Sequence, residues 1–162
     1  MQSFRRDRSC DQNDQAFRDA FVFWVMTTVL VPVRYPLSTH STSTLEKAVD
    51  LATELEAELI VLHVNLYQNG EHVTRTQLKR AVESAVGPLS FVRYSITQGF
   101  IVEETILQEI ASEKADVVVI GHKQLSRWRR AFNRLVDDPD IADYLARNVD
   151  CEVHVVAAPQ SQ

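Results

Sequence analysis

The side chains best suited to ligand chemistry stand directly after two short apolar runs. Arg34 follows the run Val29–Val33, and the segment Gly121–Gln124, which contains a histidine and a lysine, follows the run Asp116–Ile120. Arginine, lysine and protonated histidine bind anions because each carries positive charge and donates hydrogen bonds. These residues could therefore hold a phosphate-containing ligand, provided that the fold brings the two runs together.

Five short apolar runs alternate along the chain with segments of helical periodicity. Such continuous runs are typical of strands buried on both faces. Their connections are too long for hairpins, so right-handed crossovers must join parallel strands. The sequence therefore predicts an α/β fold with a doubly wound, five-stranded parallel sheet in the order 3-2-1-4-5. The predicted strands are Val29–Val33, Leu59–Val64, Phe91–Thr97, Asp116–Gly121 and Cys151–Val156.

Four helices are predicted between these strands. Ser43–Glu46 and Thr74–Gln77 have the pattern of capping boxes and predict the starts of the first two helices. The third follows the turn at Gly99, and Asp138–Pro139 supplies an N-cap and a first-turn proline for the last. Between the fourth strand and this last helix, Gln124–Asp137 is predicted to be a long loop.

In a doubly wound sheet, ligands bind at the carboxyl ends of the strands, where the strand order reverses. For this order the crevice lies between the first and fourth strands, so the two groups of polar side chains meet there. The candidate residues of this crevice are Val33, Arg34, Tyr35, Gly121, His122, Lys123 and Gln124.

Residues 1–25 differ from the rest of the chain. They are polar and charged without periodicity up to the apolar run Ala20–Val25, and aspartates lie among the arginines. This pattern excludes a signal peptide, and no uninterrupted apolar stretch is long enough for a membrane span. We interpret the segment as a leader that lies upstream of a native start at Met26 or forms a disordered tail. A short amphipathic helix packed on the domain is the alternative.

Composition narrows the classes of protein further. The 162 residues carry a formal net charge of −5, which disfavours a nucleic-acid binder that works by bulk charge. The two cysteines, Cys10 and Cys151, form neither a disulfide framework nor a zinc motif and indicate a reducing cytoplasm. We predict one domain over residues 26–158, followed by a tail at 159–162.

The order and spacing of several segments between residues 26 and 156 resemble the universal stress protein family. The resemblance implies a Rossmann-like fold of the adenine nucleotide alpha hydrolase type, a cytoplasmic location, a role in stress survival and a homodimer formed through the last strand. The segments that carry it are Val29–Val33, Leu62–Val64, Gln98–Gly99, Ala115–Gly121 and Cys151–Val156.

One branch of this family binds ATP, whereas the branch similar to universal stress protein A does not. The ATP-binding branch has an aspartate after the first strand, contacts the nucleotide with the valine of a Leu-His-Val segment, and holds the phosphates with Gly-x2-Gly-x9-Gly-(Ser/Thr). Val64 and Gly121 match this pattern. Arg34 replaces the aspartate, and Gln124 replaces the second glycine.

The end of the phosphate motif also departs from the family pattern. Pro139 and Asp140 occupy the Gly-Ser position, and Asp137 and Asp138 precede them. Proline lacks a donor N–H, and the carboxylates repel phosphate from the helix end that should attract it. In contrast, Gly121–Gln124 matches the Gly-His-x-Gln segment of the non-ATP branch. We therefore expect no cofactor, with ATP and other adenine nucleotides disfavoured.

The last predicted strand alternates in polarity. Glu152 and His154 fall on one face, whereas Val153 and Val155 fall on the other, a pattern typical of a strand with one less buried face. Such a strand can pair with its twin across a two-fold axis. We predict that Glu152, Val153, His154, Val155 and Val156 form the contact of a homodimer.

A basic segment borders the predicted crevice and has two interpretations. It could bind an anion or single-stranded nucleic acid, since Trp128 and Phe132 lie among the cations. Alternatively the arginines pair with the following aspartates, and we favour this reading because residues 123–143 sum to only +1. The cations are Lys123, Arg127, Arg129, Arg130 and Arg134.

Catalytic and metal motifs are missing from the sequence. No Gly-x-Ser-x-Gly elbow occurs, and the histidines lack the spacing of metal ligands. We predict a non-enzymatic, dimeric stress-response or interaction protein whose protein partner the sequence does not name. The alternative is a nucleotide- or anion-binding module in the crevice, and a nucleic-acid-associated protein is the less favoured third reading.

Overall fold

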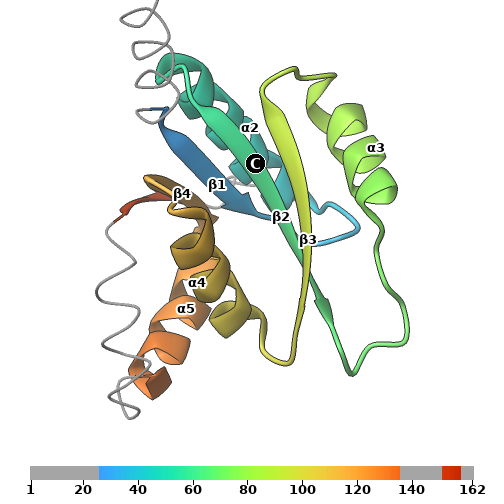
Figure 1. Cartoon of the computed structure of the whole chain (residues 1–162), viewed down its shortest axis with the longest axis vertical. Helices are drawn as coiled ribbons and strands as arrows, with labels where there is room; N and C mark the ends of the chain where they lie inside the picture. Colours follow the sequence, from blue (N-terminus) through green and yellow to red (C-terminus); the bar gives the residue numbers. More distant parts are fainter. Residues whose placement is uncertain (1–25, 136–150, 158–162) are drawn as a thin grey trace, which may run out of the picture.

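The computed structural model describes residues 26–135 and 151–157, and the account of the fold is restricted to them. These residues form a parallel sheet of five strands in the order β3-β2-β1-β4-β5, with four helices in the connections (Figure 1). The strands are β1 (Thr28–Pro32), β2 (Glu58–Leu66), β3 (Val92–Gly99), β4 (Val117–Gly121) and β5 (Glu152–Val156). The predicted α/β fold, with its strand order, is confirmed.

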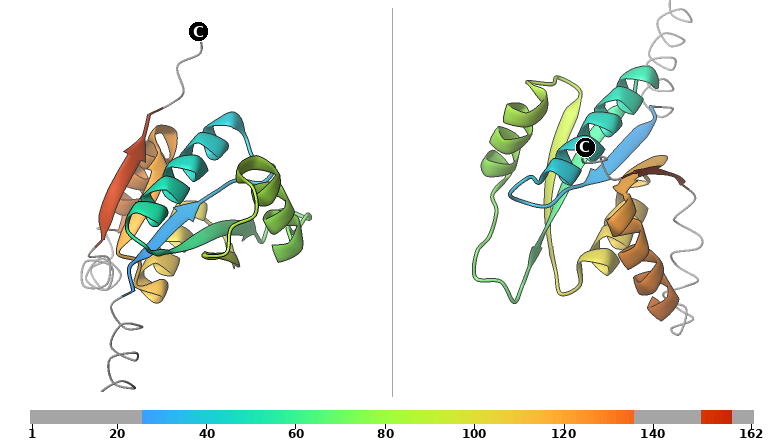
Figure 2. Two further views of the ribbon diagram at one scale, coloured as in Figure 1. Left: turned by 90° about the horizontal axis from the view of Figure 1, so that it is seen from above. Right: turned by 180° about the vertical axis from the view of Figure 1, so that it is seen from behind.

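Helices cover both faces of the sheet. The chain order is α2 (Thr39–Glu54), α3 (Arg75–Val86), α4 (Val102–Glu113) and α5 (His122–Leu135). Leu45 of α2 and Leu78 of α3 pack on one face, whereas Ile106 of α4 packs on the other. Figure 2 shows α2 and α3 on the side of the sheet opposite α4.

The two faces of the sheet have separate apolar clusters, because successive side chains of a strand point to opposite faces. In the central strand β1, Val29 and Val31 belong to the cluster under α2 and α3, and Leu30 belongs to the cluster under α4. All three are completely buried. Burial on both faces explains why β1 is a continuous apolar run rather than an alternating one.

The helix starts agree with the sequence in one case and differ in another. At α3, the Thr74 side chain accepts a hydrogen bond from Gln77 N, and the Gln77 side chain accepts one from Thr74 N, as the capping box predicts. At α2 the predicted start at Ser43 is wrong. Ser38 is the N-cap, because its hydroxyl accepts a hydrogen bond from Ser41 N at 3.2 Å and its backbone is extended.

The predicted loop Gln124–Asp137 is also wrong over its described part, since α5 is helical from His122 to Leu135. Leu125, Trp128 and Phe132 recur at helical spacing, and Leu125 packs against the cluster under α4. This amphipathic pattern stabilises a helix directly after β4. The helix predicted to start at Asp138–Pro139 lies outside the described residues, as do the leader 1–25 and the tail 159–162.

None of the helices in residues 26–135 is both long and apolar enough to cross a membrane.

Candidate functional site

The ladder between β1 and β4 opens towards the carboxyl ends of these strands. Their register runs only from Val29↔Val117 to Leu30↔Val118. Beyond this point β1 stays paired with β2 as far as Pro32, and β4 stays paired with β5 as far as Gly121. The two halves of the sheet therefore diverge at the point where strand order reverses, which is where doubly wound sheets bind ligands.

The structure places Val33, Arg34 and Tyr35 after β1 on one side of this opening. Val33 is buried, and its N–H donates to the carbonyl of Leu62 at 2.8 Å, which extends the pairing with β2 by one residue. Arg34 and Tyr35 are exposed. The arginine is thus presented to solvent at the carboxyl end of the sheet, as predicted.

The other side of the opening is formed by the end of β4 and the first turn of α5. Gly121 is the last residue of β4, His122 and Lys123 are exposed, and Gln124 is half-buried. Because the helix begins at once, backbone N–H groups of its first turn lack helical partners, and its first turn contains no acidic residue. This arrangement gives the end of β4 a positive electrostatic character.

Gly121 is closely approached by α2. A Cβ added at this position would lie 3.3 Å from the Thr44 hydroxyl, which donates to the carbonyl of His40 at 2.9 Å. A larger side chain at Gly121 would therefore press on α2 rather than project into the opening. This contact could not be predicted from the sequence, since Thr44 lies within a run of serines and threonines.

Not all predicted site residues lie on the same side of the sheet. Val33 belongs to the cluster under α2 and α3, whereas Val64 belongs to the cluster under α4 and is 9% exposed. The opening is therefore bordered by residues from both faces. Val64 is presented at the carboxyl end of β2, but it is packed in the core as well.

His63 adds a buried polar group that the sequence analysis assigned to no role at this site. Its Nδ1 lies 3.1 Å from the carbonyl oxygen of Val33, and the ring makes an edge contact with Tyr35, with 6.4 Å between centroids. The contact fixes the chain as it leaves β1 and so positions Arg34. Periodicity could not reveal it, because β2 is buried on both faces.

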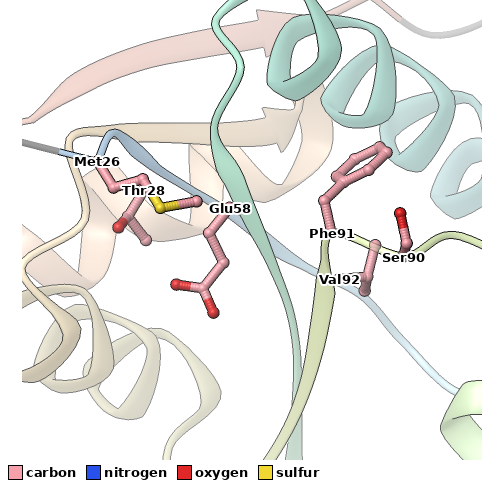
Figure 3. Close-up of a pocket in the computed structure, with 6 residues that line it drawn as sticks. All are labelled: Met26, Thr28, Glu58, Ser90, Phe91 and Val92. Atoms are coloured by element: carbon pink, nitrogen blue, oxygen red, sulfur yellow. The ribbon is translucent and has the colours of Figure 1, made fainter. Parts of the chain in front are cut away.

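A separate pocket of about 390 Å³ opens at the opposite, amino end of the strands (Figure 3). Met26, Thr28 and Glu58 line one side of it, and Ser90, Phe91 and Val92 line the other. The carboxylate of Glu58 already accepts a hydrogen bond from Arg93 Nε at 3.1 Å. The pocket lacks converging polar groups, and we assign the candidate site to the carboxyl end instead.

Within residues 26–135 and 151–157, no group of three or more histidine, cysteine, aspartate or glutamate side chains could hold a metal ion. Glu152 and His154 form an ion pair on β5, with 2.8 Å between Oε1 and Nε2. The aspartates at 137–140, on which the prediction of a degraded phosphate motif rests, lie outside the described residues.

The fold, with its opening beside β1 and β4, is that of a doubly wound, Rossmann-like α/β domain. The family model of the universal stress protein family matches residues 26–157, and the chain belongs to this family. A search of curated proteins finds no match.

Solved structures of similar fold agree with this assignment. A universal stress protein in complex with cAMP is 19% identical, with a TM-score of 0.50, over 80% of this chain and 96% of the other. A universal stress protein from Archaeoglobus fulgidus DSM 4304 is 20% identical, with a TM-score of 0.51, over 80% of this chain and 43% of the other. At these identities the likeness concerns the fold alone.

Proposed function

We propose that this chain is a non-enzymatic universal stress protein that acts as a homodimer and does not carry the ATP phosphate site of the family. The observation that carries the proposal is the segment after β4. The helix α5 begins at His122, so Gln124 is held in its first turn. A glycine-rich loop, by contrast, would let the backbone approach phosphates closely.

Arg34 supports the same conclusion from the other side of the opening. The ATP-binding branch has an aspartate at the position where this chain has an exposed arginine. Replacing a carboxylate with a guanidinium exchanges an acceptor-only group for a donor-only group. A guanidinium at this position cannot accept the hydrogen bonds that a carboxylate accepts.

Equilibrium dialysis with ATP and Mg²⁺ tests the proposal. We expect no stoichiometric binding at micromolar concentration. A variant that restores two family residues, R34D/Q124G, is the matched control for the assay. Micromolar binding of ATP by the unaltered protein would contradict the proposal.

The homodimer is proposed to form through β5. This strand is at the edge of the sheet and pairs only with β4 among the described elements. Val153 and Val155 are each 42% exposed, although valine is among the residues most often fully buried. Pairing of β5 with its twin would satisfy the free edge and cover these side chains.

A second candidate function is an anion- or nucleotide-binding module at the opening between β1 and β4. Three exposed basic residues, Arg34, His122 and Lys123, favour it. Since one relative of similar fold was solved with cAMP, a thermal-shift panel should contain cAMP, AMP, ATP and phosphate. A ligand at 100 times its Kd would stabilise the fold by about 2.7 kcal/mol. R34A/K123A should abolish that shift.

A further inference from the structure

The outer face of α5 carries a row of cations that begins at the opening between β1 and β4 and extends beyond it. Lys123, Arg127 and Arg130 are separated by four and three residues, which places them on one face of the helix. All three side chains are exposed.

Among the side chains that the structure describes, Lys123, Arg127 and Arg130 form no ion pair. The ion pairs of this part of the chain join Lys79 with Glu83, Arg93 with Glu58 and Glu113, and His154 with Glu152. None of them includes Lys123, Arg127 or Arg130. The contact of the Arg130 side chain is with its own helix, where Nε lies 3.5 Å from the carbonyl of Ser126.

The opposite face of α5 is directed towards the domain. Leu125 packs against the apolar cluster under α4. A helix that lies on a lipid surface must insert its apolar face among the acyl chains. The contact of Leu125 with the core occupies that face, so the geometry disfavours a membrane as the partner.

We propose that the basic row of α5 binds the phosphodiester backbone of nucleic acid without reading its sequence. The distance along the helix axis from Lys123 to Arg130 is about 10 Å, at about 1.5 Å per residue. One strand of duplex DNA presents a phosphate about every 3.4 Å of its axis, so the row faces about three phosphates. A repeated anion of this kind complements a linear row of cations better than a single phosphate does.

Fluorescence anisotropy with a labelled 20-nucleotide single strand and the corresponding duplex, from 25 to 200 mM NaCl, tests this proposal. Three to four phosphate contacts release counterions, so log K should fall against log salt with a slope of about −2 to −4. The variant K123E/R127E/R130E should bind at least about tenfold more weakly. K123Q/R127Q/R130Q, which keeps side-chain length and helix propensity, should lose affinity in the same direction.

The matched control is R75E/K79E/R80E, which changes the same charge on three exposed residues of α3. Its affinity for the oligonucleotides should be closer to that of the unaltered protein than the affinity of the α5 variant is. The proposal is overturned if the unaltered protein shows no binding at 25 mM NaCl, or if both reversals weaken binding equally. It is also overturned if the protein binds vesicles containing phosphatidylglycerol but not the oligonucleotides.

Discussion

The two edge strands of the sheet, β3 and β5, differ in how well their outer edges are protected from pairing with another chain. On β3, Arg93 is held by Glu58 of β2 and Glu113 of α4, with nitrogen–oxygen distances of 3.1 and 2.6 Å. On β5, Val153 and Val155 are each 42% exposed. A cation on an edge strand protects it from pairing with another chain, whereas exposed valines do not. The comparison supports the proposal that β5, and not β3, pairs with a second copy.

The extent of pairing strengthens this contrast. β3 is paired with β2 from Leu59↔Val92 to Leu66↔Gly99, and Tyr94 is buried against the cluster under α2 and α3. β5 is paired with β4 from Val117↔Glu152 to Gly121↔Val156. Tyr94 and its neighbours are therefore fixed by their own chain, while the side chains of β5 are left partly uncovered.

The largest effect is expected when a lysine is introduced on β5, and a lysine on β3 is the control. Val153→Lys should weaken the dimer by about 2 kcal/mol or more, roughly thirtyfold in Kd, because the lost apolar contact occurs twice in a symmetric interface. Gln98→Lys, at an exposed position of β3, should leave the dimer intact. Sedimentation equilibrium measures both. Equal dissociation constants for the two variants would remove the distinction between the edges.

A methyl group at Gly99 should have the next largest effect. A Cβ there would collide with the side chain of Thr105, whose hydroxyl donates to the carbonyl of Ile101 at 2.7 Å. Gly99→Ala should lower the free energy of unfolding by about 1–3 kcal/mol through overpacking. Urea denaturation measures the loss, and Gly70→Ala is the control because open space surrounds that glycine. Recovery of stability in G99A/T105A would identify the collision as the cause, and its absence would exclude it.

The ion pairs that close the β3 edge should contribute about 1 kcal/mol, since Arg93 is 46% exposed and solvent screens its charge. Its neighbouring carboxylates raise the pKa of Arg93 above its ordinary value, with the hydrogen bond to Glu113 as the main cause. A base whose pKa is higher in the folded state than in the unfolded state stabilises the fold at every pH below its unfolded-state pKa. The contribution of Arg93 to stability is therefore constant across neutral pH. A double-mutant cycle of Arg93→Met with Glu113→Gln should give a coupling that declines in 1 M NaCl. A coupling of zero would show that the β3 edge is closed by shape alone.

The smallest effect is expected at Tyr94, the buried residue of the β3 edge. Its hydroxyl has no hydrogen-bond partner in the described part of the chain, and burial raises the pKa of Tyr94, with Glu83 adding to the shift. Tyr94→Phe should therefore raise stability by up to about 1 kcal/mol at pH 7.

The pH dependence has a definite sign. Because the folded state disfavours the phenolate, the stability of the unaltered protein should fall as pH rises above 10, while Y94F should lack this loss. Chemical denaturation between pH 8 and 11 measures the difference. Tyr67→Phe is the control, because the Tyr67 side chain is half exposed. A parallel decline in Y94F and the unaltered protein would show that Tyr94 is not the titrating group.

The sequence predicted the sheet well because the strands β1, β2 and β4 are buried on both faces and form largely apolar runs. It predicted the α3 start at Thr74 because a capping box depends only on neighbours in the chain. The α2 start was missed, since Ser38 and Ser43 are equally good N-caps and the choice between them depends on where the chain leaves β1. The candidate residues at the carboxyl ends follow from strand order alone, whereas the His63–Val33 contact depends on which face each residue occupies.

The segment Gln124–Asp137 was predicted as a loop because Asp138–Pro139 offers an N-cap and a first-turn proline, which placed the next helix after it. The helical spacing of Leu125, Trp128 and Phe132 was present in the sequence, and the contact of Leu125 with the cluster under α4 shows its consequence. The long distance between Gln124 and Pro139 obscured this pattern, because the family motif places a phosphate-binding loop there. The position of a helix within a basic segment was therefore decided by tertiary packing.

Native mass spectrometry of the unaltered protein with ATP and Mg²⁺ tests the central claim most directly, because one spectrum reports both subunit number and bound nucleotide. We predict a species of twice the 18.4 kDa chain mass with no nucleotide attached. A monomer under these conditions, or a dimer that carries one ATP per subunit, would contradict the account.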